Sequence, residues 1–131
     1  MSEDSKSGSS TRLKLTSLAK WNAVQGGSLS FFNNGVGFAK DGYCRTVEGD
    51  KRHLSIAAIM THAFHQSEFG DDDYKGISAG QKTCISAHDF KKAIVEMGPD
   101  MGPKVYLSAT HDKALDVVSM SELKRYATKE K

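Results

Sequence analysis

The longest apolar run in the chain covers residues 54–63, and it limits what this sequence can fold into. Ser55, Thr61 and His62 interrupt it, and it has about half of the ~20 residues that a membrane-spanning helix needs. We therefore expect a chain that does not cross a membrane. The first ten residues, MSEDSKSGSS, lack the apolar block of a secretory signal. A cytoplasmic or other intracellular location is the resulting expectation.

The size of the chain also restricts the fold, because 131 residues and 14.3 kDa give room for one compact domain. Apolar residues make up 38% and charged residues 26% of the sequence, which is ordinary for a globular protein. The net charge of +2 gives no strong electrostatic reason to expect nucleic acid or an anionic membrane as partner. Residues 1–10 have Met1 as their only large apolar residue, so we expect a flexible polar tail before a single domain over residues 11–131.

Apolar spacing predicts a helix over residues 51–66, because Ile56 and Phe64 share one helical stripe with three other apolar residues. We expect this helix to be the central packing element. Residues 11–24 fit both a helix and a strand, and the Gln25-Gly26-Gly27 stop favours a helix. Residues 67–83 have few apolar anchors and are interpreted as a long loop.

Turn and capping residues complete the expected order of elements. Asn34-Gly35 between two apolar runs predicts a hairpin over residues 28–40, and residues 104–118 are interpreted as a second hairpin. Ser86 and Ser119 each precede an acidic residue by three positions, a pattern that opens helices. We therefore expect an α+β domain with an antiparallel sheet of about four strands, in two hairpins, and three to four helices on one face. An exposed sheet edge would suit a second subunit, so a homodimer is expected.

Several segments resemble chemical motifs, but each departs from its motif at a residue that the chemistry requires. Residues 76–83, GISAGQKT, carry Gln81 where a phosphate-binding loop needs glycine. No local spacing supports a zinc site, and no third group is evident for a thiol nucleophile. We expect no catalytic residue, no metal and no cofactor. The candidates for a metal or thiol centre are His62, His65, His88, Cys44 and Cys84, whose pairing as a disulfide the sequence leaves open.

Charge is uneven along the chain, and the N-terminal part combines basic and aromatic residues. Such a surface can hold single-stranded nucleic acid by stacking and phosphate contact, or can contact a protein. Because neighbours in a strand point to opposite faces, at least one of Phe31 and Phe32 is expected in the core. The candidate contact residues are Arg12, Lys14, Lys20, Phe31, Lys40, Arg45, Lys51 and Arg52. Met97 and Met101, in the sequence MGPDMGP, form a second candidate partner contact.

These observations favour a non-catalytic binding or assembly module that acts through protein–protein contact. A homodimeric factor that stabilises a larger assembly, including a viral one with a virion-associated location, has this profile. The first alternative is a single-stranded nucleic-acid-binding domain that uses the N-terminal hairpin. The second alternative is a small metal-dependent or thiol enzyme.

Overall fold

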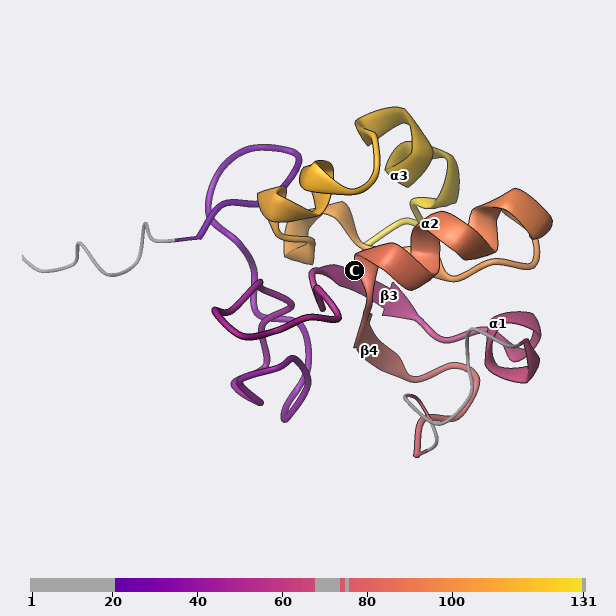
Figure 1. Cartoon of the computed structure of the whole chain (residues 1–131), viewed down its shortest axis with the longest axis horizontal. Coiled ribbons are helices and arrows are strands. Elements are labelled where there is room, and N and C mark those ends of the chain that lie inside the picture. The colour runs from indigo at the N-terminus through magenta and orange to yellow at the C-terminus, as the bar shows by residue number, and fades with distance from the viewer. Residues whose placement is uncertain (1–20, 68–73, 75, 131) are drawn as a thin grey trace, which may run out of the picture.

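A small sheet lies at the centre of the computed structural model, which describes residues 21–67, 74 and 76–130 (Figure 1). β3 (Ile56–Ile59) is the middle strand and pairs antiparallel with β4 (Lys82–Ile85) and with the two-residue strand β5 (Lys104–Val105). The α+β class is confirmed. The expected four strands are wrong in number, because the described sheet has three, and neither expected hairpin forms.

The apolar run at the centre of the sequence forms a strand where we predicted a helix. Ile56–Ile59 is extended, and the helical part of residues 51–66 is confined to α1 (His62–Gln66). β3 is buried on both faces, so its residues form a continuous apolar run whose periodicity does not distinguish a strand from a buried helix. The run is still the central packing element, as expected.

The two faces of the sheet pack against different layers. On one face, Ile56 and Ala58 of β3 and Ile85 of β4 join a large apolar cluster with the helices. On the other face, Ala57 and Cys84 join a smaller cluster with side chains from the loops that precede β3. This division follows from the alternation of side chains along each strand. Helices therefore cover one face, as expected, and residues 21–53, here named the N-terminal loop layer, cover the other (Figure 1).

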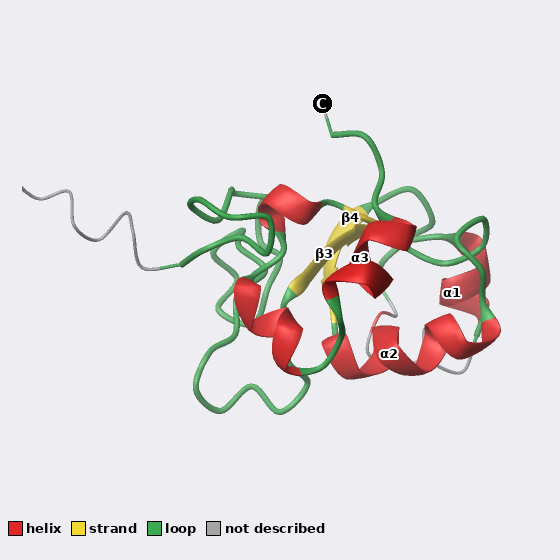
Figure 2. Cartoon of the chain, turned by 90° about the horizontal axis from the view of Figure 1, so that it is seen from above, coloured by secondary structure: helices red, strands yellow, loops and turns green. Residues whose placement is uncertain are grey.

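The two helices predicted from capping residues form where expected (Figure 2). α2 (Ala87–Glu96) begins after Ser86, whose side chain accepts a hydrogen bond from the Asp89 backbone N–H. α3 (Met120–Tyr126) begins with a complete capping box between Ser119 and Glu122. Among the described residues, no helix combines the length and apolar character that crossing a membrane requires.

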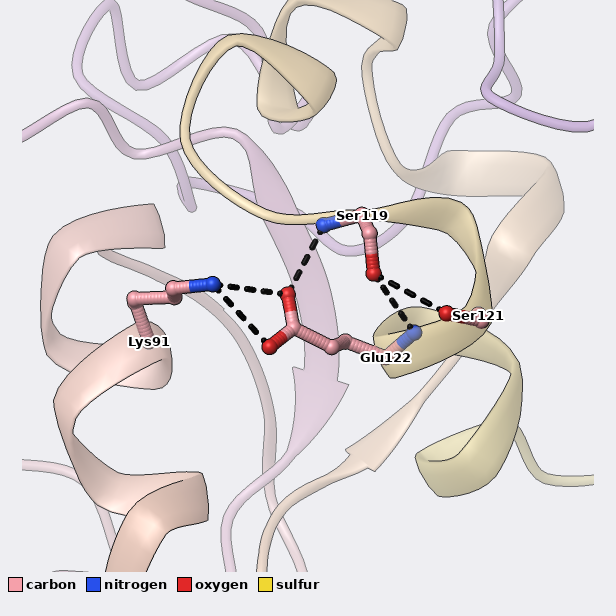
Figure 3. Close-up of polar contacts among 4 residues, drawn as sticks. All are labelled: Lys91, Ser119, Ser121 and Glu122. Atoms are coloured by element: carbon pink, nitrogen blue, oxygen red, sulfur yellow. Dashed lines mark hydrogen bonds and ion pairs between the residues drawn. The ribbon is translucent and has the colours of Figure 1, made fainter.

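An ion pair joins these two helices on the surface (Figure 3). The Lys91 Nζ lies 3.0 Å from a carboxylate oxygen of Glu122. The Ser119 backbone N–H donates to the same carboxylate and, with Lys91, lowers the pKa of Glu122. Both side chains are partly exposed, so this pair contributes little to stability compared with the buried apolar contacts.

The second predicted hairpin is replaced by turns. After β5 the chain forms two short 3-10 helices, Leu107–Ala109 and Asp112–Asp116, where strands were predicted. The outer edge of β5 is covered by the C-terminal segment, because the Thr128 N–H donates to the Val105 carbonyl at 2.9 Å and Ala127 bridges Val105. One edge of the sheet is thus closed by the chain itself.

The N-terminal loop layer lacks the predicted helix and hairpin within its described residues. Some of its backbone groups bond within the layer and others bond to distant segments, as in the 2.9 Å bond from the Val24 N–H to the Thr110 carbonyl, so tertiary contacts contribute to its conformation. Phe32 is buried and Phe31 is 51% exposed, which confirms that one of the pair is in the core. Residues 1–20, with the expected tail and most of the segment at 11–24, lie outside the described residues.

Candidate functional site

A cleft of about 460 Å³ opens between the N-terminal loop layer and the outer edge of β4. Its size falls in the range of about 300–1,000 Å³ that is typical of ligand-binding clefts. Most of its lining is apolar or glycine, and the charged side chains in it are both basic. The lining residues are 35–38 and Lys40 of the loop layer, then Arg52, Leu54, Tyr74, Ile77, Thr83 and Cys84.

A disulfide between Cys44 and Cys84 ties the loop layer to β4 beside this cleft, with the two Cα atoms 5.2 Å apart. Cys44 is fully buried and Cys84 is 4% exposed, and both pack against Phe32 and Leu54 in the smaller apolar cluster. Cys84 lines the cleft. The bond therefore fixes the position of the cleft wall relative to the strand.

The loop over residues 31–43, here named the loop wall, closes on itself through backbone hydrogen bonds. The Phe32 N–H donates to the Gly42 carbonyl at 2.8 Å, and the Gly42 N–H donates to the Val36 carbonyl at 3.1 Å. Gly37 has a φ of +94°, and a Cβ there would lie 2.3 Å from the Tyr43 carbonyl oxygen and 3.7 Å from the Cys84 Sγ. Glycine is required at this position both for its backbone angle and for the close approach.

Two basic side chains, Lys40 and Arg52, line the described part of the cleft. Lys40 is exposed and holds a φ of +59°, a conformation that costs a residue with a side chain about 1–2 kcal/mol. The Arg52 guanidinium lies over the Tyr74 ring, 5.2 Å from its centroid. No acidic residue is among the described lining residues.

Tyr74 lines the cleft and is buried. Its hydroxyl donates to the Asp89 carboxylate at 3.0 Å and accepts from the Ser86 backbone N–H at 2.9 Å. Burial raises the pKa of Tyr74 well above its ordinary value, so the phenol is neutral at physiological pH. Tyr74 therefore acts here as a fixed hydrogen-bonding side chain.

Exposed aromatic side chains lie on the loop wall next to the cleft. Phe38, which is 45% exposed, lines the cleft, and Phe31 packs edge-on against Tyr43 with ring centroids 5.6 Å apart. Tyr43 in turn contacts Trp21 at 5.4 Å. The planes of the Phe31 and Tyr43 rings are at 85° to each other, so the two rings do not offer parallel faces on which successive bases of a nucleic acid could stack.

The residues predicted from the basic and aromatic composition are only partly brought together. Lys40 and Arg52 both line the cleft, whereas Phe31 belongs to the loop wall and is not among the described lining residues. Arg45 lies 4.1 Å from the centre of the Trp21 ring and forms an ion pair with Asp41, and Lys51 is exposed outside the cleft. Arg12, Lys14 and Lys20 lie outside the described residues.

The two methionines predicted as a partner contact lie away from this cleft and differ in exposure. Met97 is half-buried against the helical core, and Met101 is 57% exposed. The Met101 carbonyl accepts a hydrogen bond from the Thr61 hydroxyl at 2.8 Å. Met101 alone therefore offers an exposed apolar side chain at this second location.

The residues considered for a metal or thiol centre are dispersed. Cys44 and Cys84 are joined to each other, and no group of three or more metal-ligating side chains occurs within the described residues. His62 is exposed and His65 is half-buried on α1. Sequence reasoning missed the cleft itself because its lining residues come from four separated segments. The available signals were the pair of cysteines and the basic residues Lys40 and Arg52.

A buried histidine, His111, links the loop layer to the segment before α3. Its Nδ1 accepts a hydrogen bond from the Thr46 N–H at 3.0 Å, and its Nε2 lies 3.5 Å from the Asp112 carboxylate. Burial lowers the pKa of His111, and the charge of Asp112 opposes this effect. Because Nδ1 must stay unprotonated to accept from Thr46, the geometry also favours the neutral ring.

Comparison with known proteins gives one family. Residues 22–127 match the model of a family described as "uncharacterized protein conserved in bacteria (DUF2237)". The match includes the loop layer, the disulfide, the cleft and all three helices. No curated protein matches the chain.

Proposed function

The chain belongs to the DUF2237 family, and we propose that it is a non-catalytic binding module that holds a protein partner at the cleft beside the Cys44–Cys84 disulfide. The observation that carries the proposal is the cleft itself, whose described lining combines apolar side chains, two basic side chains and the exposed ring of Phe38. Aromatic and arginine side chains are enriched where proteins contact one another. A rigid wall also favours binding, because less conformational freedom is lost when the partner docks.

The exposed phenylalanines favour a surface that binds a protein over one that only solvent covers. Phe31 and Phe38 are 51% and 45% exposed, and both lie on the loop wall that the disulfide holds in place. Exposed large apolar side chains are typical of interaction sites, and Phe38 is the one of the two that lines the cleft. The partner is expected to cover both rings.

A second copy of the chain is a less favoured partner at this cleft. In a two-fold dimer that buries the cleft, the basic residues Lys40 and Arg52 of both copies would approach one another. Like charges brought together in this way oppose association. We therefore propose a different protein as the partner and treat self-association as one outcome of the test.

The two alternative functions have weaker support. Single-stranded nucleic acid is bound by stacking on aromatic faces, and the perpendicular rings of Phe31 and Tyr43 do not suit successive bases. A thiol enzyme needs a free thiolate, whereas Cys44 and Cys84 are joined in a disulfide. Neither alternative is proposed.

The expected intracellular location stays a prediction and has a direct check. Disulfides are uncommon in reducing compartments, so the Cys44–Cys84 bond would be unusual there. Alkylation of free thiols immediately after lysis of the native cells would find both cysteines protected if the bond exists in the cell. Two alkylated cysteines would show that the cell keeps them reduced.

Site-specific photo-crosslinking in the native cells tests the proposed function. A photoreactive phenylalanine analogue replaces Phe38 at the cleft and, as a matched control, Val95, which is 83% exposed on α2. We expect a discrete protease-sensitive adduct from position 38 and none from position 95. A nuclease-sensitive adduct would support the nucleic-acid alternative, and an adduct of twice the chain mass would indicate a homodimer. Absence of any adduct at position 38 contradicts the proposal.

A further inference from the structure

Three aromatic side chains of the N-terminal loop layer contact one another in a row, here named the aromatic row: Trp21, Tyr43 and Phe31. The ring centroids of Trp21 and Tyr43 are 5.4 Å apart, and those of Tyr43 and Phe31 are 5.6 Å apart. Phe31 is 51% exposed and packs against the backbone of Gly42, where a Cβ would overlap the ring. Trp21 and Tyr43 are half-buried. Neighbouring apolar side chains with this exposure are typical of a surface that another segment or protein covers.

Polar contacts hold the aromatic row in place. The Asp41 carboxylate accepts a hydrogen bond from the Tyr43 backbone N–H at 3.1 Å and pairs with the Arg45 Nε at 3.0 Å. The Arg45 guanidinium in turn lies 4.1 Å from the centre of the Trp21 ring. The Trp21 carbonyl accepts from the Leu29 N–H at 3.0 Å. Because the rings are already fixed, a segment that docks on them loses only its own conformational freedom.

Trp21, at one end of the aromatic row, is the first residue that the structure describes, so the segment just before it begins at this surface. Residues 11–20, TRLKLTSLAK, contain Leu13, Leu15 and Leu18. An extended chain spans at most about 3.6 Å per residue, so Leu18 lies within about 11 Å of Trp21 and Leu13 within about 30 Å. A tether this short gives an effective concentration in the millimolar range. All three leucines can therefore reach the row, at a concentration that a separate molecule does not match.

We propose that residues 11–20 dock their leucine side chains on the aromatic row. Leucine side chains and exposed rings both gain from being removed from water. Residues 1–10 contain Met1 as their only large apolar residue, so the docking is assigned to residues 11–20. The docked segment covers Phe31 and competes for this ring with the partner proposed above, which makes the docking an autoinhibitory contact. The competition rests on the proposed function, whereas the docking itself does not.

Fluorescence of Trp21, the single tryptophan of the chain, tests the docking in the full oxidised protein. The test variant replaces the three leucines of the segment: Leu13→Ser, Leu15→Ser and Leu18→Ser. The matched control has as many substitutions in the same segment and keeps the leucines: Arg12→Ser, Lys14→Ser and Thr16→Ser. We expect acrylamide quenching of Trp21 to increase about twofold in the leucine variant, because a docked segment removes a large part of the exposed surface of the ring. In the control, quenching should equal that of the wild-type chain.

Nuclear Overhauser effects supply a second measurement on the wild-type chain. With methyl-labelled leucine, docking predicts contacts from leucine methyl groups of residues 11–20 to ring protons of Phe31 or Tyr43. Equal quenching in the leucine variant and the wild-type chain overturns the inference, as does the absence of these contacts. Wild-type quenching that changes with protein concentration also overturns it, because a second copy would then cover the row.

The outcomes separate this inference from the proposed function. A protease-sensitive adduct at position 38, together with quenching that the leucine substitutions leave unchanged, would retain the proposed function and reject the docking. Absence of an adduct at position 38, together with increased quenching in the leucine variant, would reject the proposed function and retain the docking.

Discussion

Removal of the Cys44–Cys84 disulfide is expected to destabilise the domain strongly, because the bond closes a long loop. The cysteines are 40 residues apart in sequence. For a loop of this length, the chain-entropy relation gives a stabilisation of about 4 kcal/mol at 25 °C. That is a large part of the about 5–15 kcal/mol by which most domains are stable. The corresponding fall in melting temperature is about 15 °C.

Urea denaturation of three samples measures this effect. They are the oxidised protein, the same protein after reduction, and the double variant Cys44→Ala/Cys84→Ala. We expect the free energy of unfolding to be lower by similar amounts in the reduced protein and in the double variant. In both samples the free energy of unfolding should also decrease more steeply with urea concentration, because the unfolded chain without a crosslink exposes more surface. A loss below about 1 kcal/mol in both samples would refute the loop-closure reasoning.

Three further predictions concern Gly37 in the loop wall, the cap of α3 and the buried His111. Gly37→Ala is expected to unfold at lower urea than Gly35→Ala, because both glycines have positive φ while only the Cβ at position 37 meets the Tyr43 carbonyl; equal midpoints would show that the close approach is unimportant. Ser119→Ala should cost about 1 kcal/mol in unfolding free energy through loss of the α3 cap, and Ser121→Ala, on the same turn, should cost far less. The pKa of His111 is lower in the folded chain than in the unfolded chain, where it is about 6.5. As the pH decreases below about 6.5, the unfolded chain gains a proton at His111 before the folded chain does, so the free energy of unfolding decreases until the pH reaches the pKa of the folded chain. In His111→Asn this decline should be smaller, and an unchanged decline would exclude His111 as its source.

The helices were predictable because their signals are local. The Ser86 and Ser119 caps satisfy backbone N–H groups three residues further on, which requires no distant partner. The helix assigned to residues 51–66 was wrong for the opposite reason, since Ile56–Ile59 is extended only because β4 and β5 pair with it. Tertiary pairing here overrides a helical spacing that the sequence also fits.

The candidate site was predictable only in part. Lys40 and Arg52 were identified by their charge in a basic segment, and the structure brings both to the cleft. Thr83 and Tyr74 were missed, because their role comes from the register of β4 and from a hydroxyl contact with the Ser86 N–H. Neither feature has a short-range sequence pattern.

The most direct test of the binding proposal is photo-crosslinking from position 38 in the native cells, compared with position 95. The account predicts a discrete protease-sensitive adduct at position 38 and none at position 95. The absence of an adduct at position 38, or equal adducts at both positions, would contradict the account.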